Sequence, residues 1–307
     1  MESSFVIPYV DQEAQFWETI SNLYKPYIKE VYFPIVDEII GTGRPKQPEK
    51  HLLDFLESKI LPVSVLLNPI ILPECVENLE GYIIAKLEDY MTSFNLVGIS
   101  VSNPILAKKI KNEFPELTIT ASTLLDISNE QQLNMIDDIF DVIVPSGRIL
   151  RDIRALRKLK SNFRGKLRLL VNESCLPSCV YRTQHFYEMS IHGNPYPKSL
   201  CNDLLKEKQW LSLTGGWILP QHLDFFKDVY DELKLAGRIS LQNPARYFKV
   251  LGSYIDRKNL KPHEIGGGPA SVAVPIEIDS DFYRHTLYCE KNCKTCSICE
   301  DYWNRMV

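Results

Sequence analysis

Short apolar runs alternate along the chain with longer stretches in which apolar residues recur at helical spacing. The apolar runs are rich in Val, Ile and Leu and occur at 5–10, 28–35, 62–68, 96–102, 117–122, 140–145, 166–172 and 232–237. A short apolar run of this kind predicts a strand that is buried on both faces. The pattern therefore predicts eight repeated βα units with a parallel sheet.

The stretches between the runs predict amphipathic helices, and several of them open with Asn or Asn-Pro, which can cap a first turn. They cover 51–60, 78–94, 103–114, 129–140 and 148–163. Eight such units most simply close into an α/β fold of the (β/α)8 TIM-barrel type, and an open doubly wound sheet is the alternative. No GxGxxG opens a helix after the first strand, which argues against a dinucleotide-binding fold.

The predicted barrel domain covers 1–240, and 241–307 is expected to form a C-terminal extension with a Cys-rich segment. Barrel enzymes build their sites from the loops at the carboxyl ends of the strands. The connection 173–231, between the seventh and eighth strands, is far longer than most such loops and rich in aromatic residues. We therefore expect it to be ordered and functional.

Composition narrows the class of protein. With 307 residues, 45% hydrophobic and 24% charged, the chain has the make-up of a globular protein. No run of eighteen apolar residues predicts a membrane span, and the N-terminus lacks the pattern of a signal peptide, so a cytoplasmic location is expected. The net charge of -4 does not indicate nucleic-acid binding. The basic cluster 151–160 is typical of the solvated face of a helix.

Eight cysteines in a reducing compartment indicate metal binding rather than disulfides, and seven of them follow residue 174. One group is the closely spaced tetrad Cys289, Cys293, Cys296 and Cys299. Four thiolates at this spacing predict one metal centre, with a 4Fe–4S cluster favoured and zinc as the alternative. Another alternative is that only two or three of these thiols bind the metal.

The second cysteine group is Cys175, Cys179 and Cys201, in the long connection after the seventh strand. Cys75 follows the third strand on the same face and is the candidate fourth ligand, although a buried structural cysteine is an equal alternative. His185 or a thiol of the tail would otherwise complete the site. The sequence therefore predicts one or two 4Fe–4S clusters.

Polar residues surround this second group. Asn172 and Arg148 are candidate substrate-binding residues, and the candidate catalytic residues are Glu173, Arg182, His185 and Arg238. An arginine offers a planar fork for a carboxylate or phosphate, and histidine can act as acid, base or ligand. Three arginines that follow strands of one barrel predict an anionic substrate.

The segments NESCLPSCVYRTQHF (172–186) and GGWILPQHLDFFKDVYDELKLAGR (215–238) resemble the collagenase-like peptidase U32 family. The resemblance implies a (β/α)8-type barrel and, in some branches, an oxygen-sensitive 4Fe–4S cluster held by four cysteines. Those branches are similar to oxygen-independent hydroxylases of ubiquinone precursors or of RNA, and other members are described as proteases. The family's glycine-bracketed cysteine pair is absent here, so neither reaction nor ligand set carries over.

We expect an iron–sulfur enzyme, hydroxylase-like, that modifies a small molecule, peptide or RNA without oxygen. One alternative is a U32-type protease, although HExxH is absent and HFYE at 185–188 is a weak substitute for it. Another alternative is a non-catalytic subunit with a structural or electron-transferring metal site. A partner subunit or an electron donor is expected for the redox alternatives.

Overall fold

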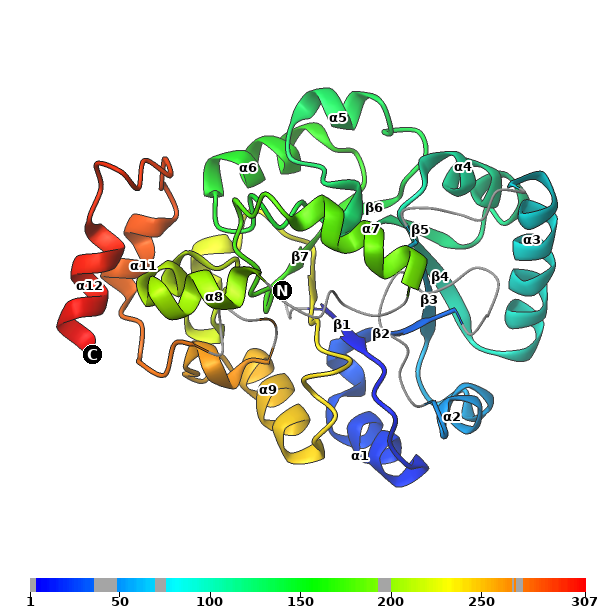
Figure 1. The fold of residues 1–307 in the computed structure, drawn as a ribbon. Helices are drawn as coiled ribbons and strands as arrows, with labels where there is room; N and C mark the ends of the chain where they lie inside the picture. The colour runs from blue at the N-terminus through cyan, green and yellow to red at the C-terminus, as the bar shows by residue number, and fades with distance from the viewer. Residues whose placement is uncertain (1–3, 36–48, 70–75, 193–199, 267, 269–272) are drawn as a thin grey trace.

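Eight parallel strands close into a barrel in the computed structural model of the chain (Figure 1), which describes residues 4–35, 49–69, 76–192, 200–266, 268 and 273–307. Each strand pairs with the next, and the last pairs with the first. The strands are β1 (Ser4–Pro8), β2 (Ile28–Pro34), β3 (Val63–Leu67), β4 (Leu96–Val101), β5 (Thr118–Ala121), β6 (Val142–Ile143), β7 (Lys166–Leu170) and β8 (Glu232–Lys234).

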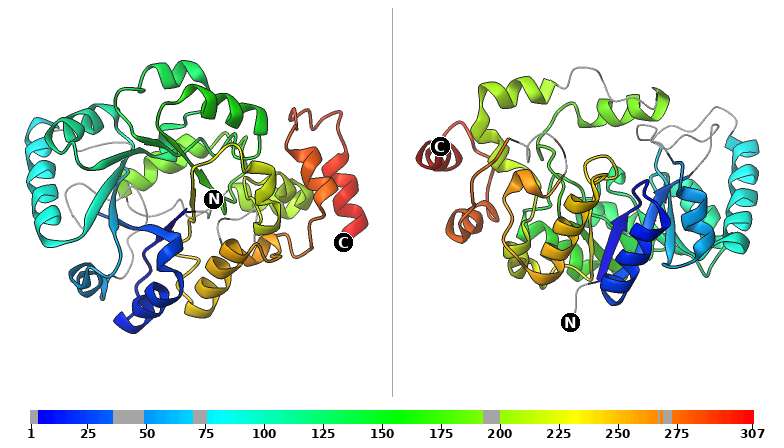
Figure 2. Two further views of the ribbon diagram at one scale, coloured as in Figure 1. Left: turned by 180° about the vertical axis from the view of Figure 1, so that it is seen from behind. Right: turned by 90° about the horizontal axis from the view of Figure 1, so that it is seen from below.

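Helices surround the barrel (Figure 2). Between the strands run α1 (Ala14–Tyr24), α2 (Leu52–Ser58), α3 (Val76–Ser93), α4 (Pro104–Glu113), α5 (Glu130–Asn134) and α6 (Ile153–Asn162). The connection from β7 to β8 holds α7 (Arg182–His192), α8 (Leu200–Glu207) and the 3-10 helices η3 (Gln209–Thr214) and η4 (Pro220–Phe226). After β8 come α9 (Pro244–Asp256), α11 (Ser280–Thr286) and α12 (Ile298–Met306). The predicted TIM-type barrel is confirmed.

All eight predicted strands are present, each ending a little earlier than its apolar run. The caps also form: the Asn103 side chain accepts hydrogen bonds from the first-turn N–H groups of Ile105 (3.0 Å) and Leu106 (3.1 Å). The predicted helix at 129–140 is wrong in its length, because α5 gives way after Asn134 to tight turns in which Ile139 N–H donates to the carbonyl of Ile136.

Outward-facing strand residues form the main core against the helices, and Val6, Tyr32 and Leu66 form a separate apolar cluster. Beside it lies a buried ion network, in which Arg168 contacts Glu30 and Glu232, both at 2.8 Å. These charges sit near the start of their strands. The buried ion pairs therefore lie away from the carboxyl ends of the strands, where barrel enzymes place their active sites.

The C-terminal segment packs against the barrel rather than extending from it. Tyr247 and Tyr254 on α9 donate hydrogen bonds to the carbonyls of Pro8 (2.9 Å) and Ile218 (2.7 Å). The α12 helix lies against η3, beside α8, at the edge of the molecule (Figures 1 and 2). The division into 1–240 and 241–307 stays a prediction.

Within the part of the chain described above, none of the helices combines the length and the apolar character that crossing a bilayer requires.

Candidate functional site

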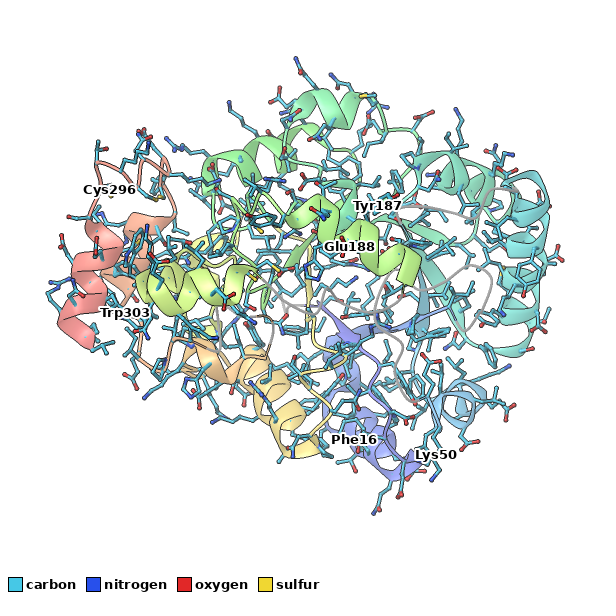
Figure 3. All side chains as sticks on the ribbon, in the orientation of Figure 1. Phe16, Lys50, Tyr187, Glu188, Cys296 and Trp303 are labelled. Carbon is cyan, nitrogen blue, oxygen red and sulfur yellow. The ribbon has the colours of Figure 1, made fainter. Side chains whose placement is uncertain are left out.

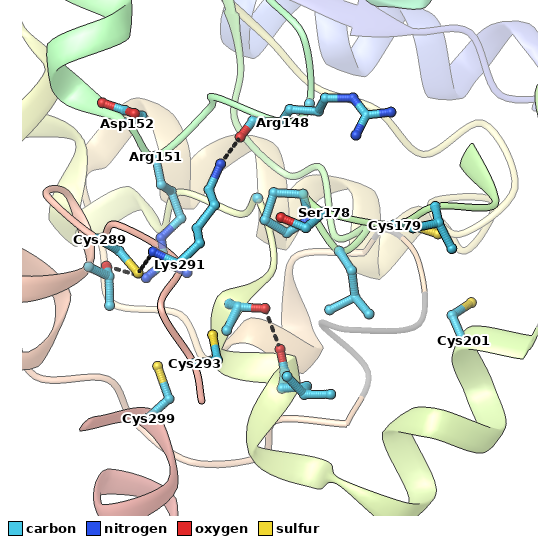
Figure 4. A pocket seen from close by; sticks show the side chains of 18 of the residues that line it. Arg148, Arg151, Asp152, Ser178, Cys179, Cys201, Cys289, Lys291, Cys293 and Cys299 are labelled. Atoms are coloured by element: carbon cyan, nitrogen blue, oxygen red, sulfur yellow. Dashed lines mark hydrogen bonds between the residues drawn. The ribbon is translucent and has the colours of Figure 1, made fainter. Parts of the chain in front are cut away.

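A cavity of about 310 Å³ lies among the loops that follow β6 and β7, α8 and the C-terminal segment (Figure 4). Its wall includes five cysteine side chains: Cys179, Cys201, Cys289, Cys293 and Cys299. The sequence predicts two separate cysteine groups, whereas the fold brings members of both to one cavity. The charged residues of the wall are Arg148, Arg151, Asp152 and Lys291.

Arg151 is buried in the cavity wall without a carboxylate partner among the described residues. Its guanidinium carbon lies 4.5 Å from the ring centre of Trp217 and 4.7 Å from that of Tyr283. Nη1 donates to the carbonyls of Leu213 (2.7 Å) and Gly215 (2.8 Å). The prediction of a solvated basic cluster is therefore wrong for Arg151, because this residue precedes α6 and belongs to the loop beneath the cavity.

Arg151 and Arg148 also hold the C-terminal segment in place. Nη2 of Arg151 donates to the hydroxyl of Thr286, at the end of α11, and Lys291 Nζ donates to the carbonyl of Arg148 at 3.1 Å. These contacts fix both ends of the short link that leads from α11 into the cysteine loop. The loop 289–299 is thereby placed against the carboxyl-end loops of the barrel.

The four tail thiols influence one another electrostatically. The pKa of Cys299 is raised to about 11, mainly by burial and also by the neighbouring thiols, while the Arg151 cation opposes the rise. Burial also raises the pKa of Cys293, with contributions from Cys289 and Cys296. Repulsion among thiolates is what a bound cation relieves. Figure 3 shows Cys296 on the outer part of this loop, and it does not line the cavity.

The tetrad fits a metal centre by its donor chemistry, because four soft thiolates select zinc or an iron–sulfur cluster. Within the described ranges, however, no three His, Cys, Asp or Glu side chains gather closely enough to hold one ion. Loop 289–299 would have to close around the metal. Cys75, the candidate fourth ligand of the other group, lies outside the described residues. Both proposed centres stay predictions.

Arg182 begins α7 and is 6% exposed. Its guanidinium carbon lies 5.2 Å from the ring centre of Phe186, and neither Nη1 nor Nη2 has a hydrogen-bond partner among the described residues. It lies against Gly147, a residue of the cavity wall. This predicted site residue is therefore a buried cation beside the cavity.

Two other predicted site residues make contacts with the backbone. Asn172 is fully buried, and its amide donates to the carbonyls of Ala236 (2.8 Å) and Ile265 (3.2 Å) while accepting from Ala236 N–H at 2.6 Å. Asn172 therefore ties the loop after β7 to the loop after β8. Glu173 accepts from the N–H of Cys175 at 2.9 Å, which orders the start of the cysteine segment.

The remaining predicted residues lie at different places around this face. Arg148 forms an ion pair with Asp126 at 2.8 Å, with both side chains partly exposed. The ring of His185 stacks on that of Phe186, on α7, with ring centres 5.8 Å apart. Arg238 lies in the loop after β8 and is not part of the cavity wall. Only Arg148 of these three lines the cavity.

Sequence reasoning missed two groups that the fold brings to this wall, Arg151 and Lys291. Neither is marked by its local pattern, because Arg151 sits in an ordinary basic cluster and Lys291 lies between cysteines. The aromatic residues that enclose Arg151 come from distant parts of the chain. The sequence signal for Arg151 is its placement between the sixth strand and the helix that follows it.

Comparison with known proteins gives two informative matches, while no protein-family model matches the chain. The uncharacterized protease MJ1657 of Methanocaldococcus jannaschii is 24% identical over 222 residues, which cover 66% of this chain and 64% of that protein. The solved structure of the U32 peptidase Mk0906 superposes with a TM-score of 0.54 at 15% identity, covering 76% of this chain and 92% of that one.

The chain is similar in sequence to this archaeal protease and in fold to a U32 peptidase. The predicted family resemblance is thereby confirmed. The chain spans about 64% of the length of MJ1657, so the activity of the whole protein is a matter for proposal. The barrel is the element shared with Mk0906.

Proposed function

We propose that the chain is an enzyme of the U32 protease type that cleaves peptides in the cavity at the carboxyl end of the barrel. The observation that carries this proposal is the cavity itself, which is enclosed by the loops after β6 and β7 where barrel enzymes place their chemistry. The similarity to a protein named a protease and to a U32 peptidase supports the reaction class.

The cavity wall offers both polar and apolar side chains to a peptide. Arg148 and Asp152 are among the polar ones, and Leu176, Leu204 and Leu211 are among the apolar ones. A peptide needs both, because its backbone must be hydrogen-bonded while its side chains are buried. The thiols of Cys179 and Cys201, both free, are the candidate nucleophiles of the wall.

The test is cleavage of oxidised insulin B chain by the purified protein, followed by mass spectrometry. Wild-type protein should cut the peptide, and Ser178→Trp, which places a large ring in the cavity, should abolish cutting. Ser161→Trp on the exposed face of α6 is the matched control and should cut normally. Wild-type protein that leaves the peptide intact, both metal-free and after anaerobic reconstitution, refutes the proposal.

A second candidate is the iron–sulfur enzyme expected from the sequence, favoured by the meeting of both cysteine groups at one cavity. When bound, a 4Fe–4S cluster would supply electron transfer or Lewis acidity beside the substrate. Cys289, Cys293, Cys296 and Cys299 would hold it, with zinc as the alternative metal. An electron donor or partner subunit would then be required.

Metal analysis separates these candidates. Iron, sulfide and zinc are measured per chain after anaerobic purification, for wild type and for Cys293→Ser. Stoichiometric iron and sulfide that are lost in the variant would favour redox chemistry. Protein that cuts peptide equally well with and without chelator would assign the chemistry to the side chains of the cavity.

A further inference from the structure

Arg182 carries a charge that the described residues do not balance. Its side chain is 6% exposed, Nη1 and Nη2 lack hydrogen-bond partners there, and no carboxylate within that part of the chain lies at ion-pair distance. An arginine cannot shed its proton, so a buried guanidinium in this state is strongly unfavourable. A site built this way is suited to an anion that arrives with the ligand.

The guanidinium lies directly behind the cavity wall. A Cβ atom on Gly147 would sit 2.7 Å from Nη2 and 2.8 Å from Nη1 of Arg182, and Gly147 lines the cavity. Gly216 also lines the cavity, and its own Cβ position would lie 3.5 Å from the Gly147 carbonyl and 3.4 Å from that of Glu173. Two glycines therefore keep this part of the wall thin.

A second buried donor lies on the same stretch of chain. The Ser174 hydroxyl is fully buried and has no hydrogen-bond partner among the described residues. Its Oγ lies 3.0 Å from the Cβ position of Gly268, in the segment that follows β8. The hydroxyl therefore faces that segment, and the unpartnered group against the wall glycine Gly147 is the Arg182 guanidinium.

We propose that Arg182 binds a carboxylate group of the peptide that enters the cavity. This inference rests on the proposed peptide-cleaving function and adds a specificity to it. The planar fork of arginine matches the two oxygens of a carboxylate with two parallel hydrogen bonds.

Charge balance favours a carboxylate over a phosphate. One guanidinium neutralises one carboxylate, whereas a phosphate monoester carries a charge of about -1.5 to -2 near neutral pH and would leave excess negative charge buried. Of the two arginines that line the cavity, Arg148 is already paired with Asp126, and Arg151 donates to the carbonyls of Leu213 and Gly215. Two sources share the carboxylate chemistry: the free C-terminus of a peptide and an Asp or Glu side chain.

The test measures binding, separately from cleavage. The probes are N-acetyl-trialanine with a free carboxylate, its C-terminal amide, N-acetyl-Ala-Glu-Ala amide, and inorganic phosphate, titrated into the full-length protein by calorimetry. We expect at least one carboxylate peptide to bind and trialanine amide to bind on the order of thirty-fold more weakly, as for the loss of one partner of a buried charge pair. The two carboxylate peptides distinguish a C-terminus from a side chain.

Two variants connect binding to Arg182. Arg182→Met should remove the preference for the carboxylate, and Arg182→Lys should retain only part of it. Gly147→Ala covers the case in which Arg182→Met fails to fold, because the added methyl group must displace the guanidinium while its charge remains. Gly81→Ala is the matched control, since no atom lies within 4 Å of its Cβ position.

Carboxylate-dependent binding that disappears in Arg182→Met or Gly147→Ala and survives in Gly81→Ala supports the inference. Equal binding of acid and amide, binding of phosphate in place of the peptides, or no binding to wild type would overturn it. Carboxylate-dependent binding without any peptide cleavage would refute the proposed function and leave this inference intact. Cleavage at a rate that depends neither on the carboxylate nor on Arg182 would support the proposed function and refute this inference.

Discussion

His222 should make the stability of the fold depend on pH through the contact between η4 and α11. The residue is 1% exposed, and its ring centre lies 4.1 Å from that of Tyr283 on α11. The pKa of His222 is lowered to about 4, mainly by burial and also by the Arg151 cation, while Asp279 opposes the shift. The folded protein therefore keeps this imidazole neutral at pH values where an exposed histidine is protonated.

The direction in which stability changes with pH follows from proton uptake by His222 in the folded and unfolded chains. The unfolded chain binds a proton at His222 near the ordinary pKa of 6.5, whereas the folded chain does not bind it until about pH 4. Stability from this group is complete above pH 6.5 and falls as the pH is lowered toward 4. At 1.36 kcal/mol per pH unit, the loss between pH 7.5 and pH 5 is about 2 kcal/mol.

The assay is urea unfolding at pH 7.5, 6 and 5. Because many carboxylates also titrate at the lower end, the relevant quantity is the difference between wild type and His222→Phe, which keeps a ring against Tyr283 without a titrating group. We expect wild type to lose about 2 kcal/mol more than the variant over this range. His285→Gln, which removes an exposed histidine of α11, should follow wild type. Parallel pH profiles for wild type and His222→Phe would refute the reasoning.

Three further outcomes are expected. Arg168→Met should lower the free energy of unfolding by about 3–5 kcal/mol in urea titrations, because it leaves the buried Glu30 without its ion-pair partner and removes one partner of Glu232, which keeps Lys29 and Lys166. The exposed Arg164→Met should cost little. Arg151→Met should speed hydrogen exchange in α11 relative to α9, since it removes the contact to Thr286. Asn103→Ala should cost about 1 kcal/mol of stability through loss of the α4 cap, measured by thermal unfolding.

Most of the barrel can be predicted from local pattern. Strands buried on both faces need continuous apolar runs, and helix starts need capping side chains, so both leave a signal in neighbouring residues. The error at 129–140 has a local cause too: the apolar spacing is helical, but Asp141 must reach back to β5, where its side chain accepts from Ile119 N–H at 2.9 Å. Tight turns after Asn134 bring it there.

The site is less predictable because it depends on contacts between distant segments. The burial of Arg151 requires Trp217 and Tyr283, which arrive from the β7–β8 connection and from α11. The presence of Cys179 and Cys293 in the wall of one cavity depends on the same packing of distant segments. Arg182 can be selected as a candidate from the sequence because cysteines and His185 lie close to it along the chain. The lack of a hydrogen-bond partner for its Nη atoms among the described residues is visible only in the structure.

The central claim is that a peptide is cleaved in the cavity with its carboxylate on Arg182. The most direct measurement compares cleavage rates of one insulin B-chain-derived peptide, as the acid and as the C-terminal amide with Glu replaced by Gln, by wild type, Arg182→Met and Gly81→Ala. We predict cleavage of the acid by wild type and Gly81→Ala, with a roughly thirty-fold loss for the amide or for Arg182→Met. Equal rates for both peptides and all three proteins, or no cleavage by any of them, would contradict the claim.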